Sequence, residues 1–184
     1  MMAKVAVLLA PGFEEIEAIA PIDILRRGEV DVLIVGVKDK VIPSARNVKI
    51  ETDITIDELK DVDSLDMIVI PGGMTGVENL KKSQEVKNLI EQMNNKKKYV
   101  SAICAGPLVL KEAGVVSNRQ ITSHPSVKLE FSESLYKEEP VVEDENITSS
   151  RGPATAMLFG FRLLEKLTSK EKAKEVAKAM LFEY

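Results

Sequence analysis

Short apolar runs alternate with segments of helical periodicity along most of the chain. Residues 5–9, 31–37, 67–70 and 99–103 form four runs with almost no polar side chain, which is typical of parallel strands buried on both faces. Between the runs, apolar side chains recur every three or four residues, which predicts helices. Strands and helices that alternate in this way predict an α/β fold, a doubly wound three-layer sandwich with a mostly parallel central sheet.

The remaining elements follow from the same periodicities. We expect helices at residues 14–27 and 83–95, one ending at 113, two more at 154–167 and 169–181, and short strands at 120–122, 140–143 and 147–149. Ser83 is a suitable N-cap for the second helix, and Gly114 a suitable stop for the third. Residues 41–55 alternate and predict exposed or antiparallel β structure. Because no internal repeat or linker interrupts the pattern, we expect one domain over residues 1–184.

The composition narrows the class of protein. The chain has 184 residues, of which 45% are hydrophobic and 29% charged, as in an ordinary soluble domain. Its formal net charge of −4 argues against specific nucleic-acid binding, which requires a basic surface. The sequence has no run of about 20 apolar residues to cross a membrane, and its N-terminus lacks the pattern of a signal peptide. We therefore expect a cytoplasmic protein.

Metal and disulfide chemistry have little support in the sequence. Cys104 is the only cysteine and His124 the only histidine. One cysteine cannot form an internal disulfide, and one thiol with one imidazole is a poor basis for a zinc site. We expect no bound metal and no cofactor.

Three loops hold most of the candidate chemistry, and each follows a predicted strand. They are residues 12–17, 71–73 and 104–107. Because the carboxyl ends of parallel strands lie along one edge of the sheet, we expect these loops to converge there.

Cys104 lies directly after a predicted buried strand and directly before a predicted helix. Backbone N–H groups at a helix N-terminus stabilise a thiolate and lower the thiol pKa. A tight strand-to-helix turn, which the small residues Ala105 and Gly106 permit, also exposes a nucleophile. A buried cysteine that acts only as a small apolar side chain is the alternative, and position alone does not decide between them.

Each of the other candidate residues also has both a functional and a purely structural interpretation. Glu17 has apolar neighbours at helical spacing, so it is either a buried carboxyl with a raised pKa or a solvated first-turn acid. The amides of Gly72 and Gly73 suit either an oxyanion hole or a plain tight turn. His124 is either a base or a structural residue, and Arg151 either an anion or subunit contact or one half of a surface salt bridge.

Four segments together resemble the ThiJ/PfpI superfamily, most closely its branch of the parkinsonism-associated deglycase (DJ-one) and bacterial relatives. They are residues 10–17, 65–73, 102–107 and 148–153, which read APGFEEIE, LDMIVIPGG, AICAGP and TSSRGP. Each motif is weak alone, but their occurrence in this order is specific, and the resemblance extends over nearly the whole chain.

The resemblance implies a flavodoxin-like sandwich that forms a homodimer. It implies that Cys104 is a nucleophile, that a protonated Glu17 carboxyl donates a hydrogen bond to its thiolate, and that His124 lies nearby. The amides of Gly73 and Ala105 would form the oxyanion hole. No cofactor is implied.

The activities of the resembling proteins give the functional expectation. It is a cysteine-dependent glyoxalase or deglycase that acts without glutathione on methylglyoxal or glyoxal, or on their early adducts with macromolecules, and yields lactate or glycolate. One alternative is an oxidative-stress sensor or chaperone-like protein that works through oxidation of Cys104. A weaker alternative is a cysteine amidase or hydrolase that uses Cys104 with His124.

Two departures from the superfamily patterns restrict what carries over. The protease branch has a histidine where this chain has Ala105, which argues against peptide hydrolysis by that arrangement. Human-type members have further cysteines where this chain has Ser44 and Glu51, so roles of those thiols do not transfer. Further matches are expected at a pocket or dimer interface, with less motif support: Gly72, Arg46, Arg27 or its neighbour Arg26, Arg151 and Pro153.

Overall fold

A seven-stranded sheet forms the centre of the computed structural model, which describes residues 2–184. The strand order is β10-β11-β7-β6-β1-β2-β5, and each neighbouring pair is parallel except β10 with β11. The strands of this sheet are β1 (Lys4–Leu9), β2 (Asp31–Gly36), β5 (Ile54–Thr55), β6 (Met67–Ile70), β7 (Tyr99–Ile103), β10 (Val141–Asp144) and β11 (Ile147–Ser150). The predicted α/β sandwich with a mostly parallel sheet is confirmed.

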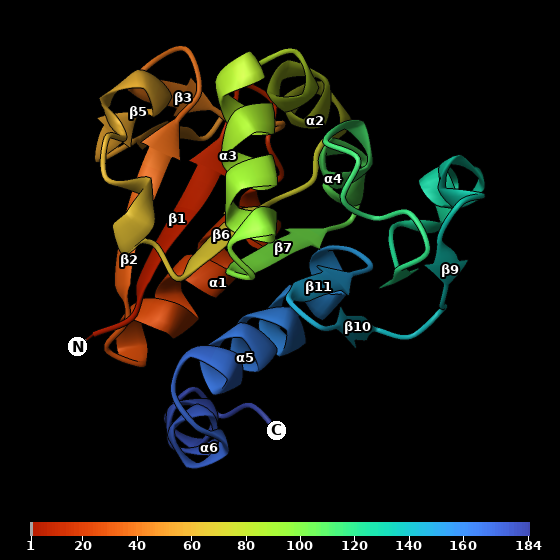
Figure 1. Cartoon of the computed structure of the whole chain (residues 1–184). Coiled ribbons are helices and arrows are strands. Elements are labelled where there is room, and N and C mark those ends of the chain that lie inside the picture. Colours follow the sequence, from red (N-terminus) through yellow and green to blue (C-terminus); the bar gives the residue numbers. More distant parts are fainter. Residues whose placement is uncertain (1) are drawn as a thin grey trace.

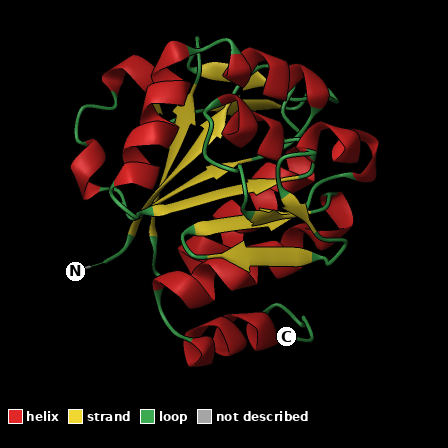
Figure 2. Cartoon of the chain, turned by 45° about the vertical axis from the view of Figure 1, so that its right-hand side comes forward, coloured by secondary structure: helices red, strands yellow, loops and turns green. Residues whose placement is uncertain are grey.

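Helices cover both faces of this sheet (Figure 2). The helices are α1 (Glu15–Arg27), α2 (Met74–Lys81), α3 (Gln84–Asn95), α4 (Pro107–Glu112), α5 (Ala156–Leu167) and α6 (Lys170–Ala179). Apolar side chains of α1, α5 and α6 form one hydrophobic core, and those of α2, α3 and α4 form a second core on the opposite face.

Strand β1 shows why the apolar runs have no polar alternation. Val5, Val7 and Leu9 point into the core beneath α1 and α5, whereas Ala6 and Leu8 point into the core beneath α3. Alternate side chains of a strand face opposite sides of the sheet, and here both sides are covered. A polar residue in the middle of β1 would therefore lose its hydration whichever way it pointed.

The long elements lie where the sequence predicts them, but several short ones do not. Residues 41–55 contain the predicted antiparallel hairpin, β3 (Val41–Pro43) with β4 (Lys49–Glu51), but β5 joins the main sheet in parallel. Helix α2 was not predicted, because Gly76 lies inside it and only three of its eight residues are buried. A small parallel sheet of β8 (Gln120–Ile121) and β9 (Leu135–Tyr136) stands apart from the main sheet (Figure 1).

The topology brings the carboxyl ends of β1, β6 and β7 together at a switch point, and the space outside these three strand ends is called the crevice. The chain leaves β1 for β2 on one side, and later returns to pair β6 with the opposite edge of β1. Ligands in doubly wound sheets bind outside the strand ends at such a switch point. The segments that directly follow these three strands contain Glu17, in the first turn of α1, Gly72 and Cys104.

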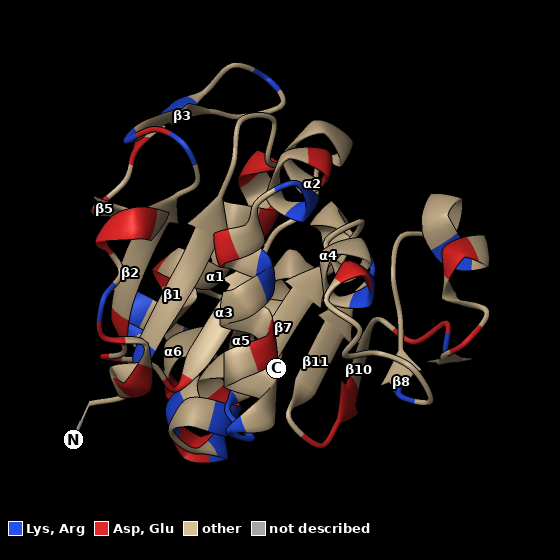
Figure 3. Ribbon diagram, turned by 45° about the horizontal axis from the view of Figure 1, so that its top comes forward, with Lys and Arg blue, Asp and Glu red and all other residues tan. Residues whose placement is uncertain are grey.

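Surface charge and helix length add two observations. Basic and acidic residues are interspersed, with both signs on α2 and on α6 (Figure 3). Within residues 2–184, no helix combines the length and the apolar character that crossing a bilayer requires.

Candidate active site

Cys104 sits in a strained turn between β7 and α4. Its φ is 65°, in the left-handed region that a non-glycine residue adopts at a cost of about 1–2 kcal/mol. Two backbone hydrogen bonds hold the turn: the Cys104 amide donates to Ser150 O at 3.0 Å, and the His124 amide donates to Cys104 O at 2.9 Å. The side chain is half-buried. The surrounding strands thus impose a conformation that directs the thiol into the crevice.

Glu17 is fully buried, with 0% of its surface exposed, although it lies in the first turn of α1. The solvated alternative is therefore wrong. One carboxyl oxygen, Oε2, accepts a hydrogen bond from the Gly72 amide at 2.8 Å. The other, Oε1, is buried and has no standard hydrogen-bond partner within residues 2–184. Burial, with a contribution from the Glu14 carboxylate, raises the pKa of Glu17 from 4.5 to about 7.

Gly72 lies between the carboxyl and the thiol. A Cβ atom at this position would overlap Glu17 Oε2 and would lie 2.7 Å from Cys104 Cβ. Glycine is the residue that leaves this space open while its amide still binds Oε2. The glycine predicted at the pocket therefore has a definite structural requirement, which is the close approach of Glu17 and Cys104.

The amides of Gly73 and Ala105 both act on the Cys104 sulfur. Each lowers the pKa of the thiol by hydrogen bonding, as expected of groups that stabilise an anion at this position. Gly73 has a φ of 86°, and a Cβ there would lie 2.7 Å from the Glu14 amide, so this turn also needs glycine. The structure thus places the two predicted oxyanion-hole amides beside the nucleophile.

The prediction that the turn lowers the thiol pKa overall is wrong. Burial, followed by the charge of the Glu17 carboxylate, raises the pKa of Cys104 from 9.0 to about 12. The amides of Ala105 and Gly73 oppose this rise but are outweighed. The reason is burial, since a thiolate beside a buried carboxylate loses more hydration than two amides replace.

Glu17 and Cys104 are therefore best described as one pair that titrates together. Burial raises the pKa of both groups, and that of the thiol lies well above that of the carboxyl, so the pair holds one proton at mildly alkaline pH. A thiolate with a protonated carboxyl and a thiol with a carboxylate have the same net charge and exchange within this state. Because Oε2 accepts from an N–H, the proton of a neutral carboxyl belongs on Oε1.

The backbone of His124 contacts Cys104, whereas its ring makes its hydrogen bonds with Ser126. Its amide binds Cys104 O, while the exposed imidazole turns to Ser126, whose Oγ lies 2.7 Å from Nδ1 and whose amide donates to Nδ1 at 3.2 Å. An N–H group can only donate, so Nδ1 is the acceptor and Nε2 carries the hydrogen of the neutral ring. No hydrogen bond links the ring to Cys104 or Glu17 within residues 2–184. A catalytic role for His124 stays a prediction.

The predicted arginines lie in three different places. The Arg46 amide donates to Glu15 Oε1 at 2.6 Å, and the Arg46 charge lowers the pKa of Glu17, so this exposed residue lies on the same side of the molecule as the pair. Arg27 lies about 15 Å further along α1 than Glu17 and forms an ion pair with Asp23 at 2.9 Å. Arg27 therefore lies away from Glu17, because α1 runs away from the strand ends, and its other predicted place, at a dimer interface, stays a prediction.

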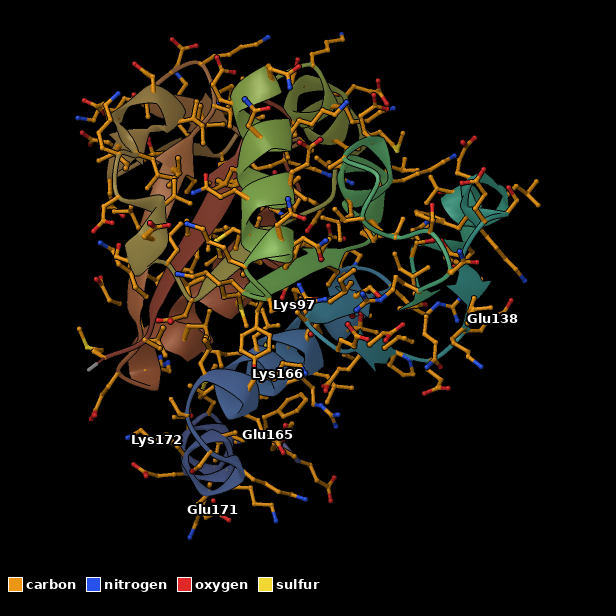
Figure 4. The ribbon with its side chains drawn as sticks, viewed as in Figure 1. Lys97, Glu138, Glu165, Lys166, Glu171 and Lys172 are labelled. Atoms are coloured by element: carbon orange, nitrogen blue, oxygen red, sulfur yellow. The ribbon has the colours of Figure 1, made fainter. Side chains whose placement is uncertain are left out.

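The remaining candidates are Arg26 on α1 and Arg151 and Pro153 just after β11. Arg26 donates to Val32 O at 3.0 Å, also away from the crevice. Arg151 Nη1 donates to the backbone oxygen of Glu138 at 3.0 Å, and Figure 4 shows Glu138 near β9 at the edge of the molecule. Pro153 is exposed at the start of a short 3-10 helix. Within residues 2–184, no group of three histidine, cysteine, aspartate or glutamate side chains is suited to holding a metal ion.

Sequence reasoning missed the part played by Glu14. It is the N-cap of α1, and its carboxylate accepts a hydrogen bond from the Glu17 amide at 2.9 Å. The available signal was the Pro11-Gly12 break just before the first helix, which marks the position of a cap. Glutamate is a less common cap than aspartate or serine, so the signal was weak.

Comparison with known proteins agrees with this geometry. The model of the DJ-1/PfpI family matches residues 3–166. The glutathione-independent glyoxalase DJ-1 of Schizosaccharomyces pombe is 38% identical over 189 residues, covering 97% of this chain and 98% of that protein. The crystal structure of Drosophila melanogaster DJ-1beta has a TM-score of 0.97 at 36% identity, with all of both chains covered. Oxidized Toxoplasma gondii DJ-1 has a TM-score of 0.95 at 33% identity, covering 99% and 100%.

Proposed function

This chain belongs to the DJ-1/PfpI family, and we propose that it is a cysteine-dependent glyoxalase that converts methylglyoxal to lactate, or glyoxal to glycolate, without glutathione. The observation that carries the proposal is the pairing of a half-buried thiol with a fully buried carboxyl of raised pKa. The glyoxalase relative from S. pombe supports the reaction type. Early adducts of the same aldehydes on macromolecules are the second candidate substrate class.

The first step forms a carbon–sulfur bond. Cys104 Sγ attacks the aldehyde carbon of methylglyoxal, and the proton of the pair resides on Glu17 as the thiolate reacts. The carbonyl π electrons move to oxygen, and the amides of Gly73 and Ala105 stabilise the resulting oxyanion. The Glu17 proton passes to that oxygen, which gives a hemithioacetal and leaves Glu17 as a carboxylate. His124 would contribute a hydrogen bond from Nε2–H to a substrate oxygen at this stage.

The second step moves hydrogen between the two substrate carbons. Glu17, as carboxylate, removes the proton from the former aldehyde carbon while the hydroxyl proton of that carbon passes to the neighbouring carbonyl oxygen, which gives an enediolate attached to sulfur and a protonated Glu17. Return of a proton to the neighbouring carbon yields a lactoyl thioester on Cys104. Water then adds to the thioester carbonyl, the carbon–sulfur bond breaks, and lactate and the free thiol are released. No external oxidant or reductant is needed, since one carbon is oxidised as the other is reduced.

Lactate formation from methylglyoxal in the absence of glutathione tests this proposal. We expect turnover by the wild type, and at least about a hundredfold loss in both Cys104→Ser and Glu17→Gln with the fold intact by circular dichroism. Lactate production by either variant at the wild-type rate would overturn the mechanism, and none by the wild type would overturn the activity.

The surface of α1 supports assembly into a homodimer. Ile16 and Ile19 are 54% and 41% exposed on neighbouring turns, and they line a shallow hollow of about 450 Å³ with Ala20 and Asp23. The β3–β4 turn lies beside this face, because Ser44 and Arg46 bind Glu15, and it carries the exposed Val48. Apolar side chains gathered in this way indicate an interaction surface. Sedimentation of wild type and Ile16→Glu would test it: a monomeric wild type would contradict the proposal.

A redox role for Cys104 is the second candidate function. The same two amides that stabilise an oxyanion would stabilise a sulfinate, and a close structural relative has been captured in oxidized form. Intact-mass analysis after titration with hydrogen peroxide should show addition of two oxygen atoms confined to Cys104. Absence of that adduct, or oxidation of methionines first, would count against this role.

A further inference from the structure

Three hydrogen bonds join Glu14, Glu17 and Gly72 in a closed ring. The Glu14 amide donates to Gly72 O at 3.0 Å, and the Gly72 amide donates to Glu17 Oε2 at 2.8 Å. The Glu17 amide donates in turn to Glu14 Oε2 at 2.9 Å. The Glu14 side chain therefore fixes the turn that carries Glu17 against the loop that binds the Glu17 carboxyl.

Glu14 also places a negative charge beside the buried pair. The charged or titratable groups that act on Glu17 come from three elements: Glu14 at the N-cap of α1, Cys104 in the β7–α4 turn, and Arg46 in the β3–β4 turn. Glu14 disfavours ionisation of the carboxyl, whereas Arg46 favours it. The groups that shift the thiol are Glu17 and the amides of Ala105 and Gly73. A charge at Glu14 therefore acts more on the carboxyl of the pair than on the sulfur.

We infer that Glu14 is a positioning residue for the reaction proposed above: its carboxylate holds Glu17 in place and biases the shared proton toward Glu17 and away from Cys104. The inference rests on the proposed function for its role in turnover. The proton distribution itself can be measured without turnover, because only the thiolate reacts with alkylating agents.

The sign of the effect follows from the charge. Removing the negative charge at Glu14 makes it easier for the pair to lose its first proton, so the pH at which the thiol becomes reactive falls. The same removal stabilises the Glu17 carboxylate relative to the thiolate, so a smaller fraction of the singly protonated pair carries the charge on sulfur. The pH profile of thiol reactivity should therefore show both a lower midpoint pH and a lower plateau rate. Simple loosening of the turn does not produce this combination.

The test is the pH dependence of Cys104 alkylation by iodoacetamide, measured from pH 5 to 10 by intact mass. Glu14→Gln keeps a hydrogen-bond acceptor for the Glu17 amide and removes the charge. We expect its midpoint to fall by roughly half a pH unit or more, and its plateau rate by roughly threefold. Glu14→Asp keeps both charge and cap, and should retain the wild-type midpoint.

Glu15→Gln is the matched control, since it removes the same charge one residue away, from a side chain that binds Ser44 and Arg46. The pH dependence of Cys104 alkylation in Glu15→Gln should match that of the wild type. An unchanged profile in Glu14→Gln, or an equal shift in Glu15→Gln, would overturn the inference. If methylglyoxal gives no lactate while the Glu14→Gln shift persists, the proposed reaction fails and the positioning of the proton stands.

Discussion

The inner and outer faces of the first turn of α1 carry two glutamates with opposite properties. Glu17 is fully buried beside Cys104, and burial raises its pKa to about 7. Glu15 lies toward the β3–β4 turn; partial desolvation would raise its pKa, but hydrogen bonds from Ser44 and from backbone amides lower it. Two residues correspond to about 200° around a helix, so the side chains point to opposite faces. Because of this difference in direction, the Glu17 carboxyl can carry a proton, whereas the Glu15 carboxylate is a structural anion.

Because both residues are glutamates, the opposite shifts of their pKa values come from their surroundings and not from the residue type. Among residues 2–184, Glu17 has one amide partner at Oε2, and only Cys104 is placed to share a proton with the carboxyl, which leaves it able to hold or release that proton. Glu15 accepts from Ser44 Oγ and from the Arg46 amide, which favours permanent ionisation. A group that must change protonation state needs few partners, whereas an anchoring group needs several.

Filling the space between Glu17 and Cys104 should have the largest effect. In Gly72→Ala the new Cβ would overlap Glu17 Oε2 and crowd Cys104 Cβ at 2.7 Å, so the pair must separate. We expect kcat/KM for methylglyoxal to fall at least about a hundredfold, with about 1–3 kcal/mol of lost stability from the crowding.

Gly152→Ala is the control for that change. Its Cβ would lie 3.6 Å from His124 Cδ2, an ordinary contact, in an extended backbone conformation. Steady-state kinetics should give activity within about twofold of wild type, since nothing in the site is displaced. Equal losses in the two variants would contradict the packing argument.

The pH dependence of Cys104 reactivity should expose the shared proton. Below the midpoint near pH 7 the alkylation rate should fall about tenfold per pH unit, and between about pH 8 and 10 it should stay level. In Glu17→Gln the plateau should vanish, because a lone buried thiol keeps gaining reactivity as pH rises toward its own pKa. A wild-type rate that climbs steadily from pH 8 to 10 would argue against the pair.

Stability should respond in opposite directions at the two glutamates. The folded-state pKa of Glu17 is raised from 4.5 to about 7, so its contribution to stability is complete below pH 4.5 and declines as pH rises through 7. The free energy of unfolding of Glu17→Gln should therefore exceed that of wild type by up to about 3 kcal/mol at pH 8, and should equal it near pH 4.

Glu15 has the reverse sign. Its pKa is lowered in the folded state, so its contribution is present at neutral pH and is lost as pH falls. Glu15→Gln should be less stable than wild type at pH 8 and should approach it in acid. Urea titrations at pH 4 and pH 8 measure both variants, and shifts of the same sign would contradict the comparison.

Replacing His124 should have the smallest effect on turnover. Its ring is held by Ser126, so His124→Ala removes at most one hydrogen bond to substrate, and kcat/KM should fall less than about tenfold. The control is Ser126→Ala, which should have no larger effect. A loss in His124→Ala as great as in Glu17→Gln would assign the imidazole to proton transfer.

The sequence predicts the scaffold of this site better than its energetics. The uninterrupted apolar run of β1 and the Pro71-Gly72-Gly73 break predict strand ends, and strand ends in a parallel sheet must meet. Helical spacing leaves the orientation of Glu17 open, and the packing of α1 on the sheet makes it inward. The rise in the thiol pKa could not be predicted, because it depends on how deeply Cys104 and Glu17 are buried together. Helix α2 was missed because packing on the sheet, more than propensity, forms it.

The central claim is that the inner glutamate of the first turn performs proton transfer for Cys104 and the outer one does not. The most direct measurement is the rate of lactate formation from methylglyoxal, without glutathione, by Glu17→Gln and Glu15→Gln side by side at pH 8. We predict that Glu15→Gln stays within a few-fold of wild type while Glu17→Gln loses at least about a hundredfold. Comparable rates in the two variants would contradict the account.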